Sequence, residues 1–193
     1  MANRLGWDSS DLSPIRNRLR VYYSVEFAKI VLACILAAIV YGIVHDQITA
    51  RICLEYFTVF HPPVFFTRSP TLLAFGWGII ATWWAGAIVG MLIGIAARFG
   101  SNAQMTTREI LPLILSLQMF MALCAITFGT IGYFKGVMPA GIDTMLPVPL
   151  HRRFLADWWA HNASYASGFV GGLTLCAIVA VRRIRSARSL AIR

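Results

Sequence analysis

Residues 71–97 read TLLAFGWGIIATWWAGAIVGMLIGIAA and contain no Asp, Glu, Lys or Arg. A membrane-spanning helix needs roughly 20 mainly apolar residues, so this stretch is long enough to cross a bilayer. Three further stretches have the same character, at about 25–44, 110–134 and 158–181. The sequence therefore predicts an all-α membrane protein, a bundle of four transmembrane helices.

The composition of the whole chain agrees with this fold class. Of its 193 residues, 58% are hydrophobic and only 13% are charged, and the mean hydropathy is +0.68. A soluble domain has about a quarter of its residues charged. These values exclude a disordered chain. They argue against an ordinary soluble globule and, despite a net charge of +9, against a nucleic-acid binder. We expect one membrane domain over 1–193, with outer loops at 45–70 and 135–157 and tails at 1–24 and 182–193.

The basic residues predict the orientation, because Lys and Arg are enriched in cytoplasmic segments. Five of the 17 fall on the side of the two loops: Arg51, Arg68, Lys135, Arg152 and Arg153. The rest fall on the side that carries both tails, so both termini are predicted to be cytoplasmic. The same bias makes anionic lipid of the bilayer a natural partner of the tails.

Small residues recur at every fourth position in two of the predicted helices. One ridge comprises Ala74, Gly78, Thr82, Gly86, Gly90 and Gly94, and the other comprises Ser164, Gly168, Gly172, Cys176 and Ala180. Such ridges let helix backbones approach closely in lipid. Two arrangements stay open: the two helices pack against each other, or a ridge forms a homo-oligomer or docks into a larger membrane complex.

Ionisable residues gather on the predicted outer side. All four histidines fall there, together with four carboxylates: His45, His61, His151, His161, Asp46, Glu55, Asp143 and Asp157. Asp157, His161 and Tyr165 are spaced by four residues and share one helix face. We expect the Asp157 carboxylate to orient the His161 ring, as carboxylates that hydrogen-bond to metal-bound histidines do. The alternative is an Asp–His pair that only stabilises a helix end.

The segment from Ile48 to Phe60 alternates between apolar and polar residues. This period of two predicts a short β-like element in the outer loop, ended by His61-Pro62-Pro63. Such an element would lie over the helix ends and bring Glu55, Tyr56 and His61 toward His161. A rigid cap whose charges pair with Arg152 or Arg153 is the alternative.

Two motifs suggest relatives. YGI at 41–43 continues through Asp46-Gln47-Ile48-Thr49 to EYFT at 55–58, and a late H-x-x-SY-x-x-G pattern covers residues 161–168. In these motifs the chain resembles a group of small bacterial membrane proteins of uncharacterised activity. The resemblance spans most of the chain and implies a multi-pass protein of the bacterial inner (cytoplasmic) membrane. It brings no activity with it.

The residues lead to three functional hypotheses. The candidate polar site comprises Asp46, Gln47, Glu55, Tyr56, Asp157, His161 and Tyr165. Mixed histidine and carboxylate ligands suit a divalent metal such as zinc, manganese or iron, and the candidate ligands are His161, Asp46, Glu55, His45 and His61. The second hypothesis is a non-enzymatic scaffold or accessory subunit of a larger membrane complex.

The third hypothesis is an oligomeric channel or transporter, for which Gln118, near the bilayer midplane, is the main polar group. No glycine-rich phosphate loop, HExxH pair or GxSxG elbow occurs in the sequence, so no catalytic residues are predicted and enzyme activity stays open.

Overall fold

Four helices of the protein are long and apolar enough to cross a membrane. The computed structural model describes residues 13–63, 65–100 and 102–191, and in these residues every regular element is helical. The candidate spans are Ser24–Ile52, Pro70–Arg98, Thr107–Lys135 and Val148–Ala187. Each contains or overlaps one predicted segment, which confirms an all-helical chain with four membrane-length helices.

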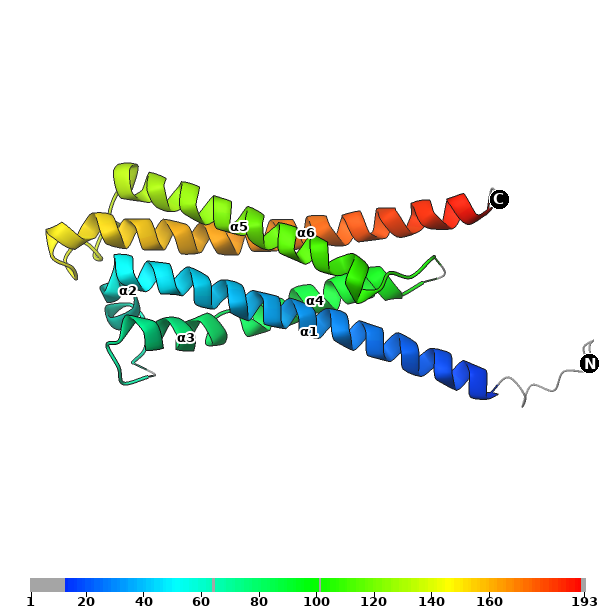
Figure 1. The fold of residues 1–193 in the computed structure, drawn as a ribbon. Coiled ribbons are helices and arrows are strands. Elements are labelled where there is room, and N and C mark those ends of the chain that lie inside the picture. The colour runs from blue at the N-terminus through cyan, green and yellow to red at the C-terminus, as the bar shows by residue number, and fades with distance from the viewer. Residues whose placement is uncertain (1–12, 64, 101, 192–193) are drawn as a thin grey trace, which may run out of the picture.

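The first and last helices extend well beyond the predicted segments. α1 runs from Ser13 to Ile52 and α6 from His151 to Ala191. Both continue as helix beyond their apolar central parts. The described start of α1 and end of α6 lie at one end of the bundle, on the right in Figure 1, and α2 lies at the other. We call the end with α2 and residues 136–150 the loop end, and the opposite one the termini end.

The second span is broken near its middle. α3 (Pro70–Ile80) and α4 (Trp83–Arg98) are separated at Ala81 and Thr82, where one continuous helix was predicted. The Thr82 hydroxyl donates to the Gly78 carbonyl at 2.5 Å, a bond back along the helix that often accompanies a bend. A Cβ on Gly42 of α1 would lie 2.5 Å from the Thr82 methyl group. The break therefore sits where α1 approaches most closely.

Side chains at the helix starts satisfy backbone amide groups. The Ser69 hydroxyl accepts from the Leu72 amide ahead of Pro70. α5 (Thr107–Lys135) begins with a capping box, in which the Glu109 carboxylate accepts from the Thr106 amide at 2.7 Å. These contacts satisfy amide groups that a helix start leaves without partners.

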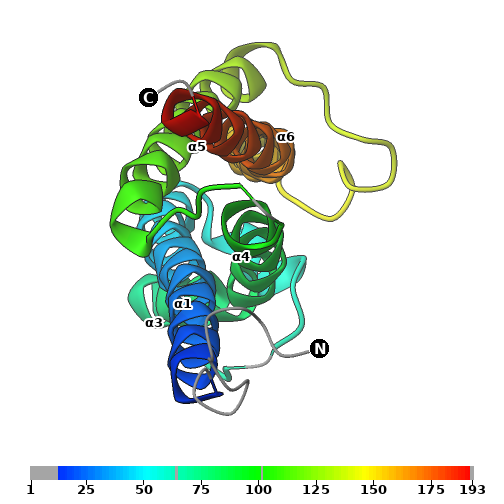
Figure 2. The same ribbon diagram turned by 90° about the vertical axis from the view of Figure 1, so that its right-hand side faces the viewer.

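The small residues of the second span pack against α1. A Cβ on Gly78 would meet the backbone of Ile43, and one on Gly90 would meet Cys34 and Val31. In Figure 2, α1, α3 and α4 lie together on one side and α5 and α6 on the other. In the α6 ridge, Gly172 faces Val89 of α4. The glycines of the second span therefore pack within the chain against α1, a helix that the sequence did not identify as their partner.

The predicted β-like element is wrong for the described residues of 48–60. α1 continues to Ile52, Cys53 is extended (φ −142°, ψ 96°), and α2 covers Leu54–Val59. The period of two misleads because the buried positions Ala50, Cys53 and Phe57 follow the spacing of three to four residues of a helix. The helix also satisfies backbone groups internally, which a single strand near lipid could not.

One polar contact crosses the apolar middle of the bundle. The amide nitrogen of Gln118 on α5 donates to the Ala37 carbonyl of α1. The side chain therefore joins two helices, which is a structural role, whereas the channel hypothesis uses it as a polar group of the conduction path.

Candidate functional site

Three of the predicted metal ligands meet at the loop end of the bundle. His45 and Asp46 lie on α1, and His161 lies on α6. One ligand atom from each residue lies within 4.8 Å of the others. α1 and α6 bring together residues more than 100 positions apart in the chain, and we call this group the His–Asp cluster.

Both ring nitrogens of His161 lie close to oxygen atoms. Its Nδ1 donates to the Asp157 carbonyl at 2.7 Å, and its Nε2 lies 3.3 Å from Oδ1 of Asp46. With the proton on Nδ1, the lone pair of the neutral ring is on Nε2 and points at the carboxylate. That arrangement suits a cation between the two atoms or a proton shared by them.

Asp157 acts on His161 differently from the sequence prediction. The backbone carbonyl of Asp157, not its carboxylate, orients the ring. The side chain is fully buried, and neither carboxylate oxygen has a hydrogen-bond partner among the described residues. The loop end therefore buries the carboxylates of both Asp46 and Asp157.

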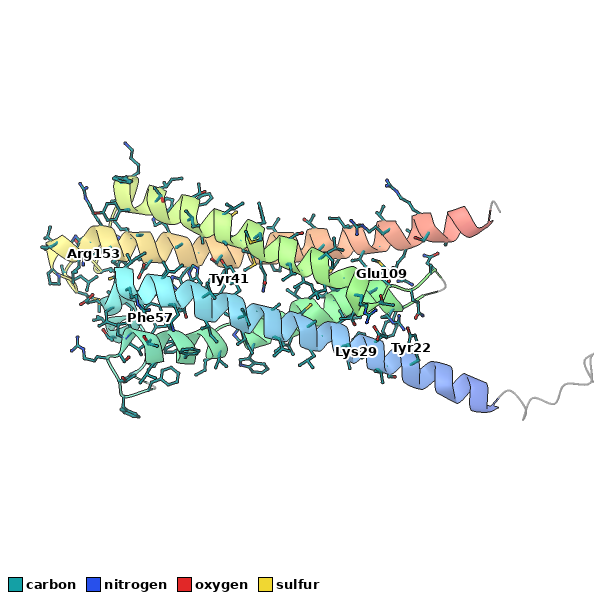
Figure 3. The ribbon with its side chains drawn as sticks, in the orientation of Figure 1. Tyr22, Lys29, Tyr41, Phe57, Glu109 and Arg153 are labelled. Carbon is teal, nitrogen blue, oxygen red and sulfur yellow. The ribbon has the colours of Figure 1, made fainter. Side chains whose placement is uncertain are left out.

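Aromatic rings enclose His161 on several sides. The Tyr56 ring of α2 stacks on it with centroids 4.5 Å apart, and the His45 ring meets it edge-on at 4.6 Å. Phe57, labelled near α2 in Figure 3, contacts it at 5.8 Å. Asp46 is 5% and His161 is 8% exposed. Asp46 and His161 are therefore buried, with His161 beneath α2, and His45 is partly buried.

The remaining predicted residues lie around the cluster. Gln47 donates to the Thr71 carbonyl and accepts from Arg51, so it ties α1 to α3. Tyr165 lies one turn along α6 from His161 and is half exposed. Neither belongs to the group of ligand atoms.

Glu55 and His61 also lie outside that group. The Glu55 carboxylate accepts a weak bond from the Cys53 thiol at 3.7 Å. His61 donates from Nδ1 to the Tyr56 carbonyl at 2.8 Å, and its ring packs against Trp77. His61 thus supports α2 instead of joining His45 and His161.

Sequence reasoning missed two residues that shape the site. Tyr41 stacks on His45, and its hydroxyl bonds with the Ser164 hydroxyl at 2.8 Å, which links α1 to α6. Phe57 is 2% exposed and packs beside Ala50 and Leu73. The spacing of Tyr41 and His45, one helical turn apart, could have indicated the first contact.

Burial changes the acid–base properties of the residues on the connecting segment. It raises the pKa of the Cys53 thiol to about 11 and raises the pKa of the Tyr56 hydroxyl above its ordinary value. It lowers the pKa of His61, against the opposing effect of the bond to the Tyr56 carbonyl. All three groups therefore favour their uncharged forms in the folded protein.

Comparison with known proteins found no matching family model, no matching curated protein and no matching solved structure. The resemblance to small bacterial membrane proteins therefore stays a prediction.

Proposed function

We propose that the His–Asp cluster binds a divalent metal ion such as zinc, manganese or iron. The observation that carries this proposal is the meeting of His45, Asp46 and His161, with ligand atoms within 4.8 Å of one another. Imidazole and carboxylate are the ligand types that such ions take in proteins.

The distances in the cluster are suitable for an ion. In a tetrahedral zinc site with bonds of about 2.1 Å, two ligand atoms lie about 3.4 Å apart. The 3.3 Å between Nε2 of His161 and Oδ1 of Asp46 is close to that value. Nε2 of His45 is buried and has no hydrogen-bond partner among the described residues. An ion would draw it inward and occupy that nitrogen.

The charges at the loop end also support a cation. Asp46 and Asp157 are 5% and 0% exposed. Asp46 contacts the His161 ring, and the Asp157 carboxylate has no positive partner among the described residues, so ionising both carboxylates is costly without a cation. A divalent ion supplies the missing positive charge. The bond from His161 to the Asp157 carbonyl resembles the outer contacts that orient metal-bound histidines elsewhere.

We further propose that the protein lies in the bacterial inner membrane with both termini in the cytoplasm. The distribution of Lys and Arg supports this orientation, and the described ends of α1 and α6 lie at the same end of the bundle. The cluster then lies at the outer surface, and its ion comes from the outer compartment.

Metal titration of the purified protein tests the proposal. We expect one Zn²⁺ or Co²⁺ per chain in wild type, measured by isothermal titration calorimetry and elemental analysis, and a loss of binding in His161→Ala. His151→Ala is the matched control, because this loop-end histidine donates to the Leu146 carbonyl and lies outside the cluster. Wild type that binds no divalent ion, or equal losses in both variants, would contradict the proposal.

A further inference from the structure

α2 covers His161 of the cluster on the side of the loop-end compartment. The stacked Tyr56 ring and the edge of the Phe57 ring, both on α2, cover His161. The other walls are α1 and α6, which are long continuous helices. An ion that approaches His161 from the side of α2 must therefore displace this helix.

The attachments of α2 allow it to move as a unit. It has six residues and follows Cys53, whose extended backbone interrupts the helix that ends at Ile52. After Phe60 the chain has no regular structure until Pro70 among the residues described there. A short helix between two irregular segments can swing while its own backbone bonds stay intact.

We propose that α2 is the lid of the metal site, and that it opens about Cys53 to admit a bare cation from the loop-end compartment. This inference rests on the function proposed above and narrows the ligand. Two rings lie within 4.6 Å of the centre of the His161 ring. Since an organic ligand cannot enter between such closely packed rings, the site takes an ion alone.

A lid and a ligand-positioning group differ in their effect on binding rates. If α2 only gates entry, removing the Tyr56 ring raises the association and dissociation rates of the ion by the same factor and leaves Kd unchanged. If Tyr56 holds His161 in place, its loss raises the dissociation rate and weakens Kd. Loss of one stacked aromatic pair corresponds to a change of about tenfold.

Stopped-flow measurement of Zn²⁺ exchange in Tyr56→Ala makes this distinction. We expect both rates to rise about tenfold with Kd unchanged within about a factor of two. Tyr56→Phe, which keeps the ring, should exchange like wild type. Tyr133→Ala is the matched control, because Tyr133 pairs with Phe134 near the loop-end terminus of α5 and is not among the rings around His161. Unchanged rates, or a weaker Kd from dissociation alone, would overturn the lid.

Cys53 provides a second measurement that needs no metal. Its side chain is 1% exposed, whereas Cys34, Cys124 and Cys176 lie within the membrane-length helices. In proteoliposomes, a membrane-impermeant maleimide should label wild type slowly and Tyr56→Ala several-fold faster, with Cys53→Ser as the background. If wild type binds no Zn²⁺, the proposed function fails and this comparison decides the lid alone: equal labelling rates would overturn it.

Discussion

Replacing each of three glycines by alanine, one at a time, tests how closely the helices approach. A Cβ on Gly78 would lie 2.6–2.9 Å from backbone atoms of Gly42 and Ile43. A Cβ on Gly90 would lie 2.9 Å from Cys34 Cβ and 3.0 Å from Val31 Cα. On Gly168 it would meet the flexible end of Met121 at 3.0 Å. Carbon atoms pack best at about 3.5–4.0 Å, so the three sites differ in how far their neighbours must move.

The magnitudes follow from what has to move. Overpacking costs about 1–3 kcal/mol, and replacing a helical glycine by alanine returns up to about 1 kcal/mol. We expect Gly78→Ala to lose about 2 kcal/mol of unfolding free energy, because only backbone lies opposite. Gly90→Ala should lose about 1 kcal/mol, and Gly168→Ala should stay within about 0.5 kcal/mol because a methionine adapts.

Reversible unfolding in mixed micelles, followed by circular dichroism, measures the three losses under the same conditions. The order Gly78 > Gly90 > Gly168 is the result that the structure requires. Equal losses, or a larger loss at Gly168, would refute the close approach of α1 to α3 and α4. Size-exclusion chromatography of Gly90→Ala adds a check, since a ridge that served a partner helix would change the oligomeric state and spare the monomer's stability.

Three further outcomes follow from single contacts. Arg183→Lys should destabilise the termini end by about 1–3 kcal/mol in thermal unfolding, because the guanidinium donates to the carbonyls of Ala96, Asn102 and Ala103 and a lysine cannot reproduce that fork. Glu26→Ala should cost about 1–2 kcal/mol, because its carboxylate accepts from both the amide and the hydroxyl of Thr107 at the start of α5; Glu26→Gln should recover part of the loss. Acidification should loosen α2. The pKa of His61 in the folded protein lies below its unfolded value of about 6.5. The stabilisation that the neutral ring provides is therefore present above about pH 6.5 and is lost as the pH falls through the folded pKa. Hydrogen exchange of residues 54–61, corrected for the intrinsic pH effect, should show this loss, and His61→Gln should remove it.

The sequence predicted the spans because hydrophobicity over a membrane thickness is a local property. It could not predict the break at Thr82, which lies against Gly42 of another helix. It also could not say which helix receives the glycines, because small residues at every fourth position mark a close contact without naming the partner. The helical end of α1 was missed because alternation over a few residues fits a strand as well as a half-buried helix.

The candidate site, like the fold, was predictable from the sequence only in part. Asp46 and His161 are predicted from residue chemistry, as a carboxylate and a histidine on the same predicted side of the membrane. Glu55 and His61 were grouped with them because the connecting segment was expected to fold over the helix ends. The fold over the ends occurs, but α2 turns Tyr56 and Phe57 toward His161. The rotation of a six-residue helix depends on its packing, which no pattern within the segment specifies.

Metal binding at the His–Asp cluster should stabilise one end of the bundle more than the other, because the three ligands come from both halves of the bundle. His45 and Asp46 belong to the half with α1, α3 and α4, and His161 belongs to the half with α5 and α6. The Tyr41–Ser164 bond is the next polar contact between α1 and α6 along the bundle. An ion shared by His45, Asp46 and His161 would join the halves at the loop end, as Arg183 joins α6 to α4 and the residues after it at the termini end. Metal should therefore stabilise the loop end more than the termini end, by an amount that grows with the free ion concentration relative to Kd.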